Sequence, residues 1–222
     1  MRVVSVNVGL PREVDWRGKQ VSTGIFKDPV EHRVRIAGVN LEGDRQADLT
    51  VHGGPDKAVY AYPAEHYPLW EQELGRELPR GMFGENLTVT GVPLEDELTL
   101  GDRLRVGTAE LVVVQPRLPC FKLGIRFADP GMVKRFLGAG RSGYYLRILT
   151  EGDVSAGDQI EILERHPAGI AVSEITRLFV HDHDDVAGLE AVLGVDVLPA
   201  DWRPYFSEKL EQAVAARRSF ET

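Results

Sequence analysis

The stretch ELVVVQPRLPCFKLGIR, residues 110–126, joins a continuous apolar run to the only cysteine of this 222-residue chain. The middle of residues 110–115 is apolar without alternation, which predicts a central strand buried on both faces. Pro116 and Pro119 then fix φ and remove two backbone donors, so we expect a stiffened loop and not a helix to lead from the strand to Cys120. The thiol would therefore be held at a defined place.

Short runs of alternating apolar residues accompany this strand throughout the sequence up to Arg165. Residues 2–8, 33–36, 86–89 and 103–106 have the period-two pattern of strands. Two helices are expected between the strands. One is opened by Pro63, or later at Pro68, with Tyr67, Trp70, Leu74 and Leu78 on one face, and a shorter one lies at residues 130–137. This part of the chain is therefore predicted to be mainly β, with interspersed helices.

From Pro167 onward the pattern changes to helices alone. Ser173 is placed to cap a helix over residues 174–180, and Asp184 or Asp185 to cap one over residues 186–193; a third is expected over residues 206–217. We therefore predict two domains, residues 1–166 and a small three-helix unit at residues 167–222. The helical unit is expected to serve stability, assembly or partner docking, and not to supply metal ligands.

The composition excludes several classes of function. The chain has 26 Lys and Arg against 34 Asp and Glu, a formal net charge of -8, so general attraction to nucleic acid or to an anionic membrane is not expected. One cysteine cannot form an internal disulfide, and residues 1–12 lack the apolar block of a signal peptide. Since no apolar run reaches the roughly 18 residues of a membrane span, we expect a soluble cytoplasmic protein.

The surroundings of Cys120 favour a chemical role. Residues 111–128 contain no acid, although the chain has an excess of acids, and they include Arg117, Lys122 and Arg126. Nearby cations favour the thiolate over the thiol. The alternative is that Cys120 is a buried small hydrophobe, which is the commoner state of a lone cysteine.

Three other clusters carry polar groups that suit ligand binding. In residues 48–60, Gly53 and Gly54 permit a turn with exposed amides beside His52 and Lys57, which is either an anion-binding nest or an ordinary turn with a satisfied histidine. Residues 19–27 offer hydroxyls and cations without an acid. They form either a phosphate-binding site or an exposed basic strand. Asn86 begins a strand after the turn at Gly84 and can donate and accept hydrogen bonds.

The run of residues 181–185, HDHDD, combines histidine with aspartate. Such a run can ligate a metal. It also stands where a helix needs an N-cap and an acidic first turn, and we favour capping.

Four motifs occur together in one order: residues 52–60 (HGGPDKAVY), 81–88 (GMFGENLT), 101–104 (GDRL) and 115–120 (QPRLPC). With them the chain resembles the MOSC family, and within it the small stand-alone bacterial members of the YiiM type. The resemblance covers most of residues 1–165, and the helical tail is similar to the three-helix appendage of that subgroup. It implies a β-barrel-like MOSC core.

The resemblance also implies a pocket for the molybdenum cofactor, molybdopterin, which is a pterin dithiolene with a terminal phosphate. Cys120 would be the thiolate ligand of the metal and a catalytic residue, and His52 and Asn86 would lie on the substrate side. The residues implied for cofactor binding are Lys19, Ser22, Thr23, Lys27, Gly53, Gly54, Lys57, Arg117 and Arg126. A soft sulfur in a cationic loop agrees with an anionic cofactor that carries a metal.

The reaction implied by the resemblance is reduction of N-hydroxylated compounds, such as hydroxylamino-purines, to amines, a detoxifying step. The chain has no recognisable flavin or iron–sulfur signature, so electrons are expected from a partner, a flavin-dependent reductase. A homodimer is left open.

Two other functions use the same thiol. A non-catalytic carrier of sulfur or of the molybdenum cofactor also needs a nucleophilic Cys120 in a basic pocket, and only turnover separates it from an enzyme. A cysteine hydrolase would pair Cys120 with His52 as base. The hydrolase is disfavoured because no third member of such a catalytic set is recognisable.

Overall fold

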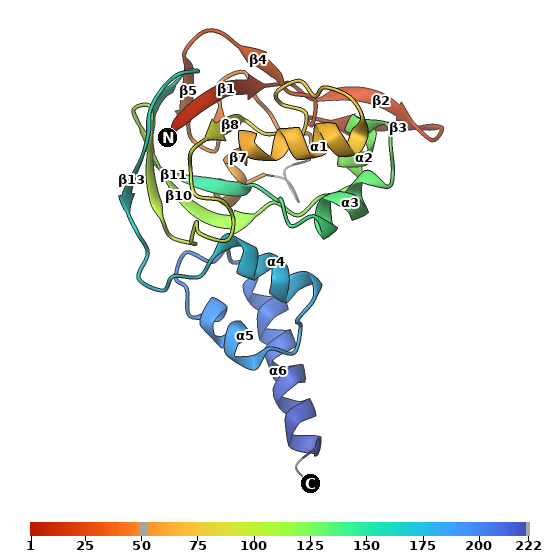
Figure 1. Ribbon diagram of the computed structural model, residues 1–222, viewed down its shortest axis with the longest axis vertical. Coiled ribbons are helices and arrows are strands. Elements are labelled where there is room, and N and C mark those ends of the chain that lie inside the picture. Colours follow the sequence, from red (N-terminus) through yellow and green to blue (C-terminus); the bar gives the residue numbers. More distant parts are fainter. Residues whose placement is uncertain (49–52, 221–222) are drawn as a thin grey trace.

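The structure is a computed structural model that describes residues 1–48 and 53–220, with side chains described as far as residue 218. Figure 1 shows a broad strand-rich part that carries the N-terminus, and a narrower group of three helices that carries the C-terminus. Backbone hydrogen bonds join the parts, since Val172 N donates to Leu98 O (2.9 Å) and Leu100 N donates to Ile170 O (2.8 Å). The predicted domain boundary after His166 thus lies just before a segment that is paired with the strand-rich part.

One eight-stranded sheet forms the frame. Its order is β13 (Ile160–Glu164), β9 (Arg103–Val106), β10 (Ala109–Pro116), β11 (Tyr144–Thr150), β7 (Val59–Pro63), β8 (Leu87–Thr90), β1 (Arg2–Val8) and β4 (Asp28–Val30). Neighbours are antiparallel except β7 and β8, which are parallel. β10 lies inside the sheet between β9 and β11, and Leu111 to Val114 are buried. The prediction of a central buried strand is confirmed.

The sheet curls back on itself. An isolated bridge joins Arg2 to Gln159, and Ile160 N donates to Met1 O (3.0 Å), so the start of β13 meets the start of β1. The ring of paired strands is not continuous, yet the core is barrel-like, as the sequence predicted. Smaller sheets flank it: β12 (Gly152–Val154) with β5 (Val34–Ala37) and β6 (Asn40–Leu41), and the hairpin β2 (Arg12–Trp16) with β3 (Lys19–Thr23).

Three helices and two 3-10 turns cover the sheet: η1 (Pro55–Lys57), η2 (Ala64–His66), α1 (Tyr67–Leu74), α2 (Phe121–Phe127) and α3 (Met132–Gly138). Pro63 is the N-cap of η2, which runs directly into α1, so the helical segment opens where the sequence predicted. The α-helix itself begins later, at Tyr67, with Pro68 in its first turn. Sequence analysis missed α2 altogether. Its buried residues Leu123 and Phe127 are four apart and share one face, so the chain turns helical immediately after Cys120.

Aromatic rings pack between these helices and the sheet. Tyr62 of β7 stacks on Phe83 with ring centroids 4.4 Å apart, and Trp70 of α1 stacks on Phe136 of α3 at 6.0 Å. All four side chains are less than 2% exposed. This aromatic core lies beside the loop that carries Cys120 and fixes the positions of α1 and α3.

The tail consists of α4 (Val172–Val180), α5 (Val186–Leu193) and α6 (Arg203–Phe220). Ser173 does not cap α4, since Ala171 holds the N-cap position, and α6 begins at Arg203 and not at Phe206. The capping prediction for Asp185 is confirmed: its carboxylate accepts a hydrogen bond from Gly188 N (3.2 Å).

Arg177 forms ion pairs with three acidic residues of the tail. Its guanidinium donates to Glu174, to Asp182 (2.6 Å) and to Asp185 (2.6 Å). The hydrogen bond from Arg177 holds the pKa of Asp185 below its ordinary value. The acidic run therefore serves the local structure between α4 and α5.

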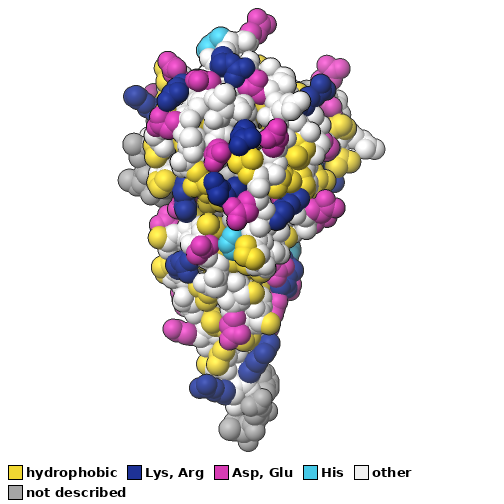
Figure 2. Space-filling model, turned by 90° about the vertical axis from the view of Figure 1, so that its left-hand side faces the viewer, with side chains coloured by type: hydrophobic (Ala, Val, Ile, Leu, Met, Phe, Trp, Pro, Cys, Tyr) yellow, Lys and Arg dark blue, Asp and Glu magenta, His cyan; other side chains and the backbone are white. Residues whose placement is uncertain are grey.

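The molecular surface mixes charges of both signs. Figure 2 shows Lys and Arg side chains interspersed with Asp and Glu over the face that carries β13. Ion pairs there include Arg103 with Glu164 (3.1 Å) and Arg105 with Glu161 (3.1 Å). Within the described residues, no helix is both long and apolar enough to cross a membrane.

Glu85 is a buried carboxylate on which several segments converge. It is 0% exposed and accepts hydrogen bonds from Gly81 N (2.9 Å), Phe83 N (3.1 Å), the Thr88 hydroxyl (2.8 Å) and the Tyr67 hydroxyl. Four donors satisfy the buried charge. Glu85 thereby ties the start of α1 to β8 and to the turn before it.

We predict that Glu85→Ala lowers the free energy of unfolding by about 3 kcal/mol, because four buried donors lose a charged acceptor. Urea denaturation measures the change. Glu97→Ala, at an exposed carboxylate, is the matched control and should change stability by less than about 0.5 kcal/mol. Equal effects of the two substitutions would refute the structural role of Glu85.

Candidate functional site

Cys120 lies where the central strand leaves the sheet. β10 ends at Pro116, residues 117–119 form the connection, and Cys120 is the N-cap residue of α2 with an extended backbone (φ -116°, ψ 174°). The proline pair and the helix fix the backbone on both sides of the thiol. Cys120 borders two cavities, and Lys57 and Tyr145 line both of them as well.

The first cavity is strongly basic. Five cations line it: Lys27, Arg45, Lys57, Arg117 and Lys122. Among its described lining residues there is no carboxylate. The cavity volume is about 90 Å³, which suits a small anionic group; a larger ligand would extend beyond it.

Arg117 is the most unusual of these cations. It is 6% exposed, and its guanidinium lies over the rings of Tyr60 (5.2 Å) and Phe136 (5.3 Å). Within the described residues, its buried Nη1 has no hydrogen-bond partner. A buried donor without an acceptor is costly. Burial opposes the charge of Arg117, but attraction to Tyr60, to Tyr145 and to Cys120 raises its pKa above the ordinary value. The arrangement favours an anionic acceptor in the cavity and a thiolate at Cys120.

A buried ion pair stands behind the cavity. Lys27 donates to Asp44, and burial lowers the pKa of Lys27 although Asp44 opposes the shift. Asn86 Nδ2 donates to Asp44 (2.9 Å), and Asn86 Oδ1 accepts from Tyr60 N (3.0 Å). The amide of Asn86 is therefore used for positioning, which leaves it little capacity for a substrate.

The structure brings six of the proposed site residues into the lining of the first cavity: Thr23, Lys27, Lys57, Asn86, Arg117 and Cys120. Lys19 and Ser22 lie exposed on the β2–β3 hairpin, and Gly53 and Gly54 precede η1 outside the described lining. Arg126 stands over the ring of Phe26 at 5.1 Å and is likewise absent from that lining. His52 falls outside the described residues.

Sequence reasoning missed Arg45, Gln46, Tyr60 and Tyr145, which also line the cavity. Tyr60 is the last residue of the motif at residues 52–60, and this motif could have identified it as a lining residue. Arg45 and Tyr145 come from a loop and a strand without a local signal, and only the fold brings them to Cys120.

The second cavity lies between the strand-rich part and the tail, and its volume is about 390 Å³. Leu118, Pro119 and Tyr145 line one side. Phe179 of α4, Trp202 just before α6 and Tyr205 in the first turn of α6 line the other. Figure 1 shows these helices below the sheet.

Gln115 connects this wall to the first cavity. Its Oε1 accepts a hydrogen bond from Trp202 Nε1 (2.6 Å), and its Nε2 donates to the carbonyl of Asp56 (2.8 Å), the residue before Lys57. The tail is therefore hydrogen-bonded to the strand that leads to the thiol.

Comparison with known proteins decides the family. Residues 48–161 match the MOSC domain and residues 170–213 match the YiiM-like 3-alpha helix domain. The chain belongs to the MOSC family. YflK of Bacillus subtilis is 43% identical over 210 residues, which are 95% of each chain. The crystal structure of YiiM from Geobacillus stearothermophilus superposes with a TM-score of 0.79 at 35% identity, covering 94% of this chain and 98% of that one.

A third relative of this MOSC protein is a longer protein of Gibberella moniliformis named Reductase. It is 36% identical over 152 residues, which are 67% of this chain and 27% of that protein. MOSC domains are associated in general with binding of the molybdenum cofactor. The family and the barrel-like fold with a three-helix tail, both expected from the sequence, are confirmed.

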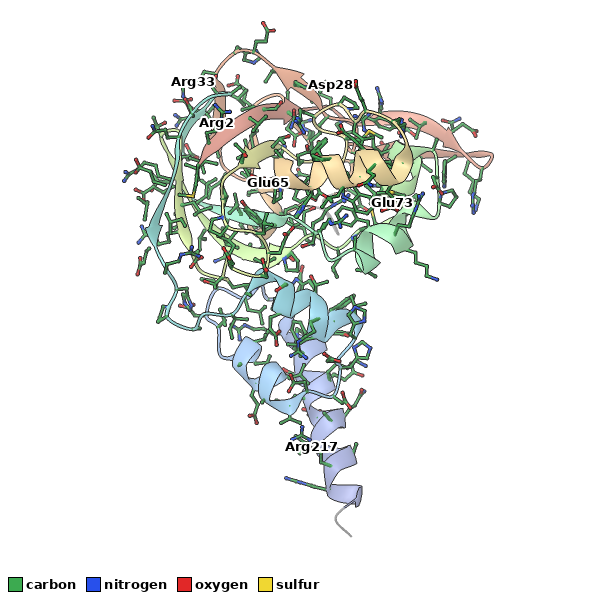
Figure 3. The ribbon with its side chains drawn as sticks, in the orientation of Figure 1. Arg2, Asp28, Arg33, Glu65, Glu73 and Arg217 are labelled. Atoms are coloured by element: carbon green, nitrogen blue, oxygen red, sulfur yellow. The ribbon has the colours of Figure 1, made fainter. Side chains whose placement is uncertain are left out.

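We predict that the basic cavity of this MOSC domain binds inorganic phosphate, and that Arg117→Gln weakens binding about tenfold, because a charged buried donor is lost. Calorimetric titration measures the affinity. Arg2→Gln is the matched control: Arg2 lies on the side of the sheet away from α2 and α3 (Figure 3) and should leave the affinity unchanged. Equal affinity of Arg117→Gln and the parent protein would contradict the assignment.

Proposed function

We propose that this MOSC protein is an oxidoreductase that uses the molybdenum cofactor to reduce N-hydroxylated compounds, such as hydroxylamino-purines, to amines. The observation that carries the proposal is the single thiol beside the buried, incompletely paired Arg117 at the border of two cavities. One of these cavities is basic and the other is largely uncharged. The family and the relative named Reductase support an oxidoreductase.

The residues of the first cavity fit such a cofactor chemically. A thiolate is a soft ligand suited to a redox metal, and among the described residues of the cavity wall Cys120 alone carries sulfur. Arg117 Nη1 lacks an acceptor within the described residues, and phosphate oxygens accept from arginine strongly. We therefore assign Cys120 to the metal, and Arg117, Lys57, Lys122 and Thr23 to the anionic part of the cofactor.

The proposed reaction breaks the N–O bond: the hydroxylamine takes up two electrons and two protons and leaves as amine and water. The bound cofactor would supply the two electrons. Tyr145 and Lys57 line both cavities, so each can donate a hydrogen bond to the departing oxygen. Burial raises the pKa of Tyr145, which keeps its hydroxyl protonated.

A partner must reduce the cofactor again after each turnover. We propose a flavin-dependent reductase as that partner. Only 27% of the protein of Gibberella moniliformis named Reductase matches this chain, so that protein has room for further domains, which is consistent with electron delivery from outside the MOSC domain.

We predict that Cys120→Ala, in protein made in a host that synthesises the cofactor, lowers bound molybdenum and the reduction of 6-hydroxylaminopurine by about a hundredfold or more, because the metal loses its protein ligand. Metal analysis and product formation with a chemical reductant measure both. Ser173→Ala, at a small residue outside the described lining of both cavities, should change neither.

Two results would overturn the proposal in different ways. Full activity of Cys120→Ala would remove the thiolate from the mechanism. Stoichiometric molybdenum without any turnover by the parent protein would favour a cofactor carrier.

A further inference from the structure

The second cavity has an aromatic wall to which the proposed reaction assigns no role. Phe179, Trp202 and Tyr205 contribute it, and their rings also contact one another: Phe179 lies 5.4 Å from Trp202 and 4.9 Å from Tyr205 between centroids. Buried Phe206 stacks beneath Trp202 at 5.3 Å. The wall is thus supported from behind by the core of the tail.

Hydrogen bonds hold this wall in position. Trp202 Nε1 donates to Gln115 in β10 (2.6 Å), and Arg147 of β11 donates to Val197 O in the tail (3.3 Å). Since β10 leads into the loop of Cys120 and β11 pairs with β10, the wall and the thiol keep a fixed relation. A preformed aromatic wall binds flat rings with little loss of side-chain entropy.

The two cavities differ sharply in charge. Five cations line the first, of which Lys27 is paired with Asp44, whereas Lys57 is the only cation among the described residues that line the second, where Asp201 adds a carboxylate. An anionic cofactor is favoured in the first cavity and a neutral ligand in the second. The volume of about 390 Å³ falls within the ordinary range for small-ligand sites.

We propose that the second cavity is the substrate site, and that it selects N-hydroxylated compounds with a flat, uncharged aromatic ring by stacking that ring against Trp202 and Tyr205. The inference rests on the proposed function. The tail thereby contributes to specificity, beyond the stability or docking role expected from the sequence. The N–OH group faces the wall shared by both cavities, where Cys120, Lys57 and Tyr145 lie.

The test compares a ring substrate with a ringless one. Tyr205→Leu keeps apolar volume and removes the aromatic face. With 6-hydroxylaminopurine and a chemical reductant, we expect KM to rise about tenfold and kcat to change little, because base–aromatic stacking is lost. With N-methylhydroxylamine, KM should stay unchanged. Glu211→Ala, at an exposed residue of α6, is the control and should alter neither substrate.

Three results would overturn the inference. If the aromatic wall does not bind the ring, Tyr205→Leu would change KM for neither substrate, or for both equally. Loss of bound molybdenum in Tyr205→Leu would show that the cofactor and not the substrate occupies the second cavity.

A binding measurement keeps the inference separate from the proposed function. Adenine, the product, should quench the fluorescence of Trp202 saturably in the parent protein and not in Trp202→Phe, because Trp16 and Trp70 are not among the residues that line the cavity. If the loaded protein reduces neither substrate, the proposed function fails, and saturable quenching still supports an aromatic site. Absence of quenching in the parent protein overturns the site itself.

Discussion

The buried charge of Asp44 is the constraint on which the basic cavity depends. Its side chain is 1% exposed and accepts from Lys27, from Asn86 Nδ2 (2.9 Å) and from Gly9 N (3.0 Å). A buried carboxylate is tolerable only when it is fully paired, so the residue after β1 and the residues before β4 and β8 converge on it. Lys27 is thereby neutralised locally, and the charge that remains for a ligand comes chiefly from Arg117 and its neighbours.

Much of this arrangement could be predicted from local sequence. The apolar residues before Gln115 indicated a central strand, and the acid-free stretch around Cys120 indicated a basic setting for the thiol, because both signals are contiguous in the chain. The Asp185 cap was predictable for the same reason, since a capping residue acts within one helical turn.

What escaped prediction depends on contacts between distant segments. The helix after Cys120 was missed because two nearby prolines suggested a loop, whereas packing of Leu123 and Phe127 on the aromatic core selects the helix. Lys27 lines the cavity as expected, but its pairing with Asp44, 17 residues away, was not predictable from the local sequence. The second cavity was invisible to sequence analysis because its walls come from β10, α4 and α6.

We propose Cys120 as the junction between an anion-binding side and a ring-binding side, with the metal held at the thiolate. X-ray absorption at the molybdenum edge tests this claim most directly, since it counts the sulfur ligands of the metal. We expect the protein as purified from a cofactor-synthesising host to show one sulfur ligand more than the molybdenum that the Cys120→Ser variant retains, where an oxygen takes the place of the thiolate. Identical sulfur coordination in the two proteins would contradict the account.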